Sequence, residues 1–435
     1  MMLNLLELKV DDASVVDQAG IVFHYEDRVF RAISSDYVDL YTTLLSSGEL
    51  SELFSCGLVK TWIAKDIAIQ GFDLVLEHEK IQFISTWREW TSGMAKDAAL
   101  LYLNLSILLE KKGLKLKDTE PENIQFVNGR PMWIDFGSIV LNSNKPEFHF
   151  QGFQVNHLIP LWLISKGFND LGFSIYLEAS IERLKKMFLK KPLCYLPLKA
   201  YWSYRKEKST HKKLINLENY VASLDMQISK GYWTDYPEHG NPDPKFENTF
   251  SKKALCVFEA LKKTKGATLL DMAGNKGWFS LLAANMGFSV VCFDLDEVSI
   301  ERLYQIVKKE SFPVLPLKLD FLVPSHPYGY NLGKKSSFER LSSDVVLALA
   351  IIHHLVFKAF VRFDTFSSIL SKYTKKYALV EFIPKEDQYV SQWNVERFPW
   401  YNLDNFIDSL SIYFNEIEVV DSDPHPRKLL ICKKS

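Results

Sequence analysis

The chain has 435 residues, of which 47% are hydrophobic and 14% aromatic, so it can form two or three globular units and is not a disordered tail. Lys plus Arg number 52 against 53 Asp plus Glu, which excludes the basic excess typical of a general nucleic-acid-binding protein. Five cysteines without a CxxC spacing or a Cys/His cluster exclude a disulfide framework and a zinc signature, so we expect no metal site.

The N-terminal sequence MMLNLLELKVDD carries acidic residues where a signal peptide has its basic end. No apolar run approaches the ~20 residues that a membrane-spanning helix needs. We therefore expect a cytoplasmic protein.

The first half of the chain mixes strand and helix patterns. Short strands are expected around residues 20–33 and 73–79, a long helix at about 89–111, and further helices after Gly152. This half is predicted to be α+β.

A linker is predicted at residues 231–244, GYWTDYPEHGNPDP, which are dense in glycine, proline and aromatic residues. We therefore expect one domain at residues 1–240 and a second at residues 241–435.

Two motifs in the first half, KDTEPENIQF and WIDFG, resemble the catalytic loop and the metal-binding DFG of protein kinases. The resemblance implies a catalytic base at Asp118 and metal ligands at Asn123 and Asp135.

The kinase pattern is incomplete. Leu116 and Lys117 replace the usual His-Arg, and Glu120 replaces the usual lysine. Neither a glycine-rich loop nor a Val-Ala-Ile-Lys strand is recognisable, so the phosphates of ATP would lack both a lid and a cation. We interpret this half as a degenerate kinase-like domain, with an active sugar or small-molecule kinase as the alternative.

A basic stretch at residues 181–213 contains eleven Lys or Arg and two acidic residues, interleaved with aromatic residues. Such a stretch is usually a solvated helix face. Its alternative role is to bind phosphate, a pyrophosphate-linked glycan or an anionic membrane surface peripherally.

The second half alternates short apolar runs with helical stretches. The runs ATLLDMAG, SVVCFDLD, PVLPLKLDF and DVVLALAI predict parallel strands flanked by helices. After KYALVEFIP and a helical stretch at about 402–410, FNEIEVVD and RKLLICKK predict an antiparallel hairpin at the end of the sheet.

The first of these strands runs into the turn LLDMAGNKGWFS, which then opens a helix. Backbone N–H groups at such a turn can approach a nucleotide-like ligand. The turn lacks the third glycine of the dinucleotide fingerprint, which disfavours a dehydrogenase. Its pattern instead fits the methyltransferase turn, with predicted cofactor contacts from Asp271, Ala273, Gly274, Asn275 and Gly277.

Two further acids follow the next two strands. Asp294 is placed to accept hydrogen bonds from ribose hydroxyls, and Asp320 lies where the adenine amino group is expected. The neighbouring Leu295, Phe321 and Ala348 complete the predicted cofactor-binding set. The alternative for each acid is a helix cap or a solvated strand end.

His353 and His354 follow the fourth strand, where chemistry in such folds takes place. A neutral imidazole there can orient or deprotonate a hydroxyl acceptor. The alternative is that both histidines are structural.

The quoted motifs, together with SSGELSELFSCGLV and VLEHEKIQFISTWREW in the first half, resemble the class I methyltransferases of the NoeA-type nodulation group. This resemblance implies the strand order 3-2-1-4-5-7-6, S-adenosylmethionine as the cofactor, and a saccharide acceptor. The chain has Ala273 before Gly274 where that group tends to have the reverse order.

We therefore predict O-methylation of a saccharide or a cell-surface glycan precursor, the acceptor being anionic or lipid-linked if the basic stretch binds it. A kinase, a bifunctional kinase and methyltransferase, and a non-catalytic scaffold are the alternatives. The sequence identifies neither the methylated atom nor the oligomeric state, and the insertion at residues 324–342 carries no recognised specificity code.

Overall fold

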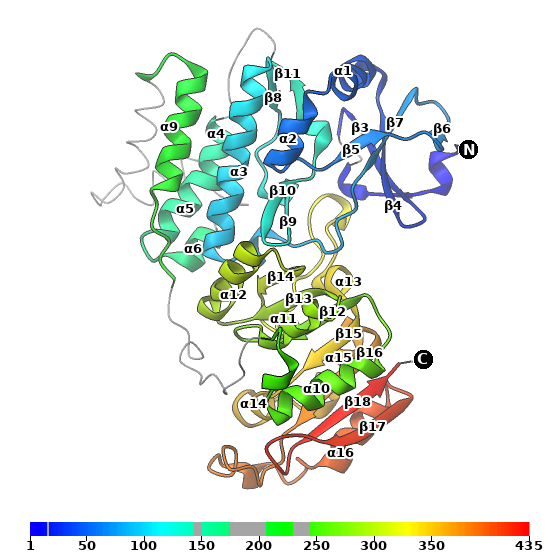
Figure 1. Cartoon of the computed structure of the whole chain (residues 1–435), viewed down its shortest axis with the longest axis vertical. Coiled ribbons are helices and arrows are strands. Elements are labelled where there is room, and N and C mark those ends of the chain that lie inside the picture. Colours follow the sequence, from blue (N-terminus) through cyan, green and yellow to red (C-terminus); the bar gives the residue numbers. More distant parts are fainter. Residues whose placement is uncertain (15–16, 143–149, 175–205, 229–243, 435) are drawn as a thin grey trace. The chain divides into compact units, whose positions relative to one another are not determined.

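The computed structural model describes residues 1–14, 17–142, 150–174, 206–228 and 244–434. The chain divides into two compact units (Figure 1): unit 1 is Met1–Ser229 with Pro327–Lys335, and unit 2 is Lys230–His326 with Ser336–Ser435. The predicted boundary near residue 240 lies outside the described residues.

Unit 1 is an α+β unit whose largest sheet has the strand order β2-β3-β4-β7-β5, with antiparallel neighbours throughout. Smaller sheets pair β1 with β6, β8 with β11 and β9 with β10. The strands are β1 (Met2–Leu3), β2 (Lys9–Val10), β3 (Gly20–Tyr25), β4 (Arg28–Ile33), β5 (Thr61–Ile63), β6 (Ala68–Ile69), β7 (Leu74–His78), β8 (Leu114–Leu116), β9 (Ile124–Val127), β10 (Arg130–Trp133) and β11 (Ile139–Leu141).

The long predicted helix of unit 1 is present and begins later than expected. It starts at Ser92 because Thr91 caps it, accepting the N–H of Met94 at 3.3 Å, while Trp87–Glu89 forms a separate short turn. The described helices are α1 (Ser35–Ser46), α2 (Leu50–Cys56), α3 (Ser92–Lys111), α4 (Phe150–Phe153), α5 (Ile159–Ile164), α6 (Asn169–Ser174) and α9 (Thr210–Ala222).

Unit 2 contains a seven-stranded sheet in the order β14-β13-β12-β15-β16-β18-β17. Numbered within the unit, this is 3-2-1-4-5-7-6. The strands from β14 to β16 are parallel, whereas β18 is antiparallel to both of its neighbours. The strands are β12 (Thr268–Met272), β13 (Ser289–Asp294), β14 (Val314–Lys318), β15 (Ser343–Ala348), β16 (Thr374–Phe382), β17 (Glu416–Asp421) and β18 (Lys428–Lys433). The predicted class I methyltransferase fold and its terminal hairpin are confirmed.

Helices cover both faces of this sheet. Side chains of α10, α11 and α12 pack with Leu269, Leu347 and Leu379 on one face. On the other face, Phe406 of α16 stacks on Phe382 with ring centroids 5.5 Å apart. The helices are α10 (Lys252–Lys263), α11 (Trp278–Asn285), α12 (Glu297–Glu310), α13 (Ser337–Leu341), α14 (Ile352–Ala359), α15 (Phe363–Tyr373) and α16 (Leu403–Ser411). Because both faces are buried, the inner strands are continuous apolar runs, whereas β17 at the edge of the sheet is largely exposed.

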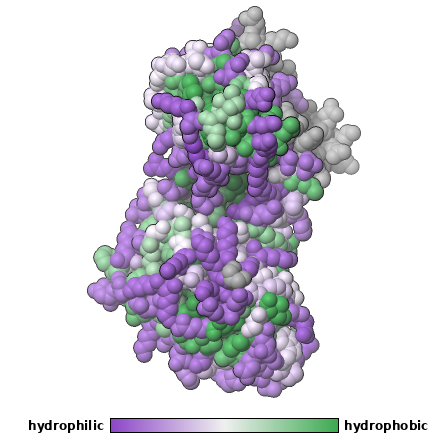
Figure 2. Space-filling view, turned by 90° about the vertical axis from the view of Figure 1, so that its right-hand side faces the viewer, coloured by the Kyte–Doolittle hydropathy of each residue, from purple (hydrophilic) through white to green (hydrophobic). Residues whose placement is uncertain are grey.

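The face of the molecule in Figure 2 is mainly hydrophilic, with smaller apolar patches among the polar side chains. Within the described ranges, no helix is long and apolar enough to cross a membrane.

Candidate functional site

Three acids lie at the carboxyl ends of three neighbouring strands in unit 2. Asp271 is the fourth residue of β12, Asp294 ends β13, and Asp320 follows β14 by two residues. Since β14, β13 and β12 are adjacent and parallel, the acids share one edge of the sheet. This edge is where open α/β sheets bind ligands.

The turn after β12 has an unusual backbone. Ala273, Asn275 and Gly277 have φ values of 55°, 51° and 72°, the left-handed region that side chains with a Cβ rarely adopt. Ala350, after the adjacent strand β15, also has a positive φ of 53°. Left-handed residues of this kind cluster at ligand-binding sites, where the surrounding structure imposes the strain.

Gly274 is required by close packing. A Cβ at this position would lie 2.5 Å from Sγ of Cys292 and 2.7 Å from Oδ2 of Asp271. Its own N–H donates to the carbonyl of Phe293 at 3.1 Å, which ties the turn to β13.

Asp271 is only 2% exposed, and its Oδ2 accepts a hydrogen bond from the Ser280 hydroxyl at 2.7 Å. Burial raises the pKa of Asp271 to about 7, and the nearby Asp294 adds to the rise, while the Ser280 hydrogen bond opposes it. A cationic ligand group beside Asp271 would therefore stabilise its charged form.

Asp294 is 7% exposed and already accepts two backbone hydrogen bonds. Oδ2 accepts the N–H of Asn275 at 2.8 Å, and Oδ1 accepts the N–H of Asp296 at 2.9 Å. Burial raises its pKa, although both N–H donors favour the carboxylate. Each oxygen has a second lone pair that a ribose hydroxyl could use. The adjacent Leu295 side chain is 56% exposed, which provides an apolar surface at the same edge.

The other predicted cofactor residues are less available. Oδ1 of Asp320 accepts the N–H of Leu322 at 2.8 Å, which is a turn cap. Phe321 is buried and stacks on Phe366 with ring centroids 5.5 Å apart, and Ala348 is fully buried at the end of β15. Their contact with the cofactor stays a prediction.

The two histidines lie in the first turn of α14. His353 is 4% exposed, and its Nδ1 has no hydrogen-bonding partner in the described part of the chain. His354 is half-buried, with its ring centroid 4.1 Å from that of His353 and 5.0 Å from that of Trp393. Burial lowers the pKa of His353 to about 2 and that of His354 to about 4. Both imidazoles are therefore neutral at physiological pH.

Sequence reasoning missed a partly buried ion pair at the same edge of the sheet. Nζ of Lys253, in the first turn of α10, lies 2.7 Å from Oε2 of Glu381 in β16. Ser422 donates to the other carboxylate oxygen at 3.2 Å. An acid inside the apolar run ALVEF indicated that Glu381 needs a buried partner, but no local pattern identified Lys253 as that partner.

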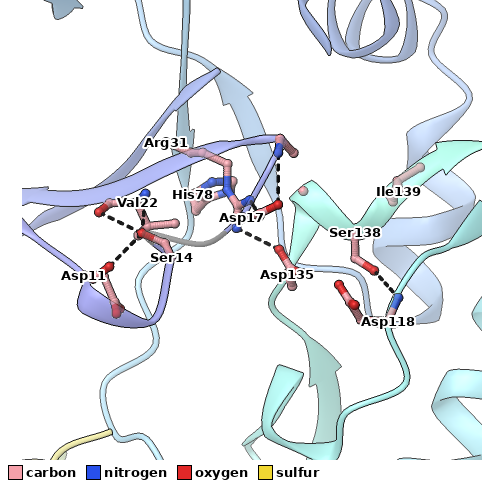
Figure 3. Close-up of polar contacts among 12 residues, drawn as sticks. Asp11, Ser14, Asp17, Val22, Arg31, His78, Asp118, Asp135, Ser138 and Ile139 are labelled. Carbon is pink, nitrogen blue, oxygen red and sulfur yellow. Dashed lines mark hydrogen bonds and ion pairs between the residues drawn. The ribbon is translucent and has the colours of Figure 1, made fainter. Parts of the chain in front are cut away.

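The kinase-like set lies in unit 1, and Figure 3 shows two of its members, Asp118 and Asp135. Asp118 follows β8, and its N–H donates to Oγ of Ser138 at 3.3 Å. Asp135 precedes the turn Phe136–Ser138, and Asn123 ends the turn Pro121–Asn123. Burial, together with the nearby Asp135, raises the pKa of Asp118 to about 6.

Sequence reasoning missed two cations beside these acids. Arg31 of β4 is 5% exposed and donates to Oδ1 of Asp135 at 2.7 Å, and it also pairs with Asp17. Lys117 pairs with the same Asp17 carboxylate. In Figure 3, Arg31, Asp17 and Asp135 point toward one another. A Cβ at Gly137 would lie 1.8 Å from Nη1 of Arg31, so the glycine of the DFG-like motif makes room for this guanidinium.

Most of the basic stretch at residues 181–213 lies outside the described residues, which resume at 206. Its predicted phosphate or membrane contact stays a prediction.

No family model matches the chain. It is 26% identical over 440 residues to the nodulation protein NoeA of Rhizobium meliloti (strain 1021), across 91% of this chain and 90% of that protein. The chain is a NoeA homologue. The similarity to NoeA extends through both units, as the motifs quoted from both halves of the sequence implied.

Two solved structures match parts of the chain at low similarity. The bifunctional kinase-methyltransferase WbdD is 15% identical with a TM-score of 0.34, across 46% of this chain and 44% of that chain. The N-methyltransferase NodS from Bradyrhizobium japonicum WM9 is 13% identical with a TM-score of 0.30, across 41% of this chain and 92% of that chain. The chain thus spans less than half the length of WbdD, and neither likeness bears on the reaction.

Proposed function

We propose that this NoeA homologue is an S-adenosylmethionine-dependent methyltransferase that methylates a hydroxyl group of a saccharide or a glycan precursor. The observation that carries the proposal is the edge of the unit 2 sheet, where Asp271, Asp294 and Asp320 follow three adjacent strands around the strained turn at Ala273–Asn275. This arrangement fits a nucleoside with a charged amino-acid end.

Each acid has a distinct role in this proposal. Asp294 accepts hydrogen bonds from the ribose hydroxyls, with the exposed Leu295 side chain beside it for apolar contact. Asp271 faces the ammonium group of the cofactor, and Asp320 faces the adenine amino group. Gly274 lets the turn pack closely against Cys292 and Asp271, which fixes the turn beside the acid that these roles use.

When bound, the cofactor would supply an electrophilic methyl group on its sulfonium, with S-adenosylhomocysteine as the leaving group. His354 is neutral and half-buried in the first turn of α14, so it can accept or orient the proton of an acceptor hydroxyl. His353 is more deeply buried and holds the ring of His354 in place. The remaining rate enhancement comes from positioning.

The proposal is tested by calorimetric titration of the purified full chain with S-adenosylhomocysteine, followed by methyl transfer from labelled S-adenosylmethionine to saccharides carrying hydroxyl or amino groups. We expect S-adenosylhomocysteine to bind and label to appear on the hydroxyl acceptor. If S-adenosylhomocysteine does not bind, S-adenosylmethionine is not the cofactor. If only the amino acceptor is labelled, the proposed O-methylation is wrong. An anionic, lipid-linked saccharide belongs among the acceptors because of the basic stretch at 181–213.

A second candidate function is phosphate transfer by unit 1. It is favoured by Asp118, whose pKa of about 6 suits a general base, and by the cations Arg31 and Lys117 near Asp135. Against it, both cations are already paired with Asp17. A rise in the melting temperature with ATP and magnesium, lost in Asp118→Asn with Asp135→Asn, would support this function, since a ligand of the native state raises the midpoint.

A further inference from the structure

The ion pair between Lys253 and Glu381 is unusual because of where its charges lie. The Glu381 side chain is fully buried, whereas the Lys253 side chain is 20% exposed. Glu381 is satisfied by Lys253 at one oxygen and Ser422 at the other. A ligand that binds at the surface can therefore contact Lys253 but not Glu381.

This ion pair lies on the same face of the sheet as Asp271. Asp271 pairs in register with Leu347, and Leu347 with Leu379, which stands two residues before Glu381. Side chains two residues apart on a strand point to the same face. Asp271 and Glu381 therefore project toward the side that carries α10, and both lie toward the carboxyl ends of their strands.

The charge of Lys253 acts on the candidate site from this position. It lowers the pKa of Asp271, against the larger effect of burial, and adds to the burial that lowers the pKa of His353. Lys253 is thus within electrostatic reach of both the acid of β12 and the histidine that follows β15.

A purely structural role does not explain well why this ion pair is present. Replacing a buried ion pair with packed apolar side chains is often neutral or stabilising. The ammonium of Lys253 has three donors, and among the described residues one hydrogen bond, to Glu381, uses one of them. Two donors remain for a ligand.

We propose that Lys253 binds the carboxylate of the amino-acid end of S-adenosylmethionine, with Glu381 as the positioning residue that holds the Lys253 ammonium. This assignment rests on the proposed function. The amino-acid end is a zwitterion, so it requires an anion for its ammonium and a cation for its carboxylate. Asp271 and Lys253 are charges of the correct sign at one edge of the sheet.

The test compares two ligands that differ only in the amino-acid end. S-adenosylhomocysteine has it, and methylthioadenosine carries a methyl group in its place. We expect Lys253→Met to weaken S-adenosylhomocysteine about 10- to 150-fold, the loss typical of a charge-assisted hydrogen bond, and to leave methylthioadenosine binding unchanged. Lys253→Arg should retain most of the affinity. Lys263→Met, which alters an exposed pair at the other end of the same helix, is the matched control and should change neither ligand.

Removing Lys253 alone leaves the Glu381 charge buried, so the double variant Lys253→Met with Glu381→Leu is measured beside it. Loss of S-adenosylhomocysteine affinity in the folded double variant, with methylthioadenosine retained, supports the assignment. If the affinities for both ligands fall equally, or the affinity for S-adenosylhomocysteine does not fall, the assignment of Lys253 is wrong while the proposed function stands. If the wild-type chain binds neither ligand, the proposed function fails and the assignment fails with it.

Discussion

Oδ2 of Asp294 accepts a hydrogen bond from the backbone N–H of Asn275 at 2.8 Å, so the acid that ends the second strand holds the turn that follows the first. The same carboxylate also accepts the N–H of Asp296 through Oδ1. Asp294 therefore has a structural task in addition to its proposed contact with ribose. Both the stability and the ligand affinity of variants at this position must therefore be measured.

Asp294→Ala should lower the affinity for S-adenosylhomocysteine about 10- to 150-fold, because hydrogen bonds to a charged acceptor are lost. It should also lower the free energy of unfolding by about 1 to 3 kcal/mol, since two backbone donors lose their acceptor. Calorimetric titration and chemical denaturation measure the two effects. Asp294→Asn retains an acceptor oxygen and should cost less in both. Unchanged ligand affinity in a folded Asp294→Ala variant would remove Asp294 from the site.

Cofactor binding should strengthen as the pH rises from 6 to 8. Burial raises the pKa of Asp271 to about 7, so below that pH the side chain is mostly protonated and cannot pair with the ligand ammonium. Binding must then release a proton, and the affinity should fall by up to about tenfold per pH unit below 7. The observed enthalpy at pH 6 should therefore depend on the ionisation heat of the buffer. In Asp271→Asn both effects should disappear, and a pH-independent affinity in the wild type would contradict the assignment.

Gly274→Ala should abolish cofactor binding and destabilise unit 2. The new Cβ would lie 2.5 Å from Sγ of Cys292 and 2.7 Å from Oδ2 of Asp271, so the turn must move away from β13. We expect an overpacking cost of about 1 to 3 kcal/mol. Calorimetric titration of the folded variant measures the loss. An affinity equal to that of the wild type would show that the turn does not contact the ligand.

Asp118→Asn with Asp135→Asn should leave the rate of methyl transfer per folded molecule largely unchanged, since both acids belong to unit 1. The change at Asp135 removes a charged partner of the buried Arg31 and should cost about 1.5 to 3 kcal/mol of stability. Asp118→Asn alone removes no ion pair of Arg31 and serves as the control. A methyl-transfer rate that falls with Asp118→Asn alone would show that unit 1 contributes directly to the reaction.

The sheet of unit 2 was predictable because its determinants are local. Buried parallel strands appear as continuous apolar runs, and Asp271 and Asp294 stand at the ends of two of them. The left-handed turn was also visible, since Asn275 and Gly277 are residue types that tolerate positive φ. These features need no knowledge of distant contacts.

The charged partners were not predictable for the opposite reason. Arg31 pairs with Asp135, which is 104 residues away in the sequence, and Lys253 pairs with Glu381, which is 128 residues away. Neither cation lies in a recognisable motif, and each is positioned by packing between elements that are far apart in the sequence. The incomplete kinase pattern predicted the positions of the acids in unit 1 but not the arginine that pairs with them.

His354→Ala should lower the turnover number more than it lowers cofactor affinity. His354 lies in the first turn of α14, after the strand that borders the candidate site, and its imidazole is neutral because burial lowers its pKa to about 4. Taking or orienting the acceptor proton contributes about 100- to 10,000-fold in enzymes that use it, although positioning can replace part of this. Steady-state kinetics with the folded fraction determined by calorimetry measures the loss.

The pH dependence separates a catalytic His354 from a structural one. An imidazole that accepts the proton must be neutral, so with a pKa of about 4 the wild-type turnover number should show no decline near pH 6.5 and should fall only at more acidic pH. His353→Ala is the matched control, because that side chain is more deeply buried and should mainly lower the melting temperature. If both variants melt earlier but retain equal rates per folded molecule, the histidines only pack beneath Trp393, and the catalytic assignment is wrong.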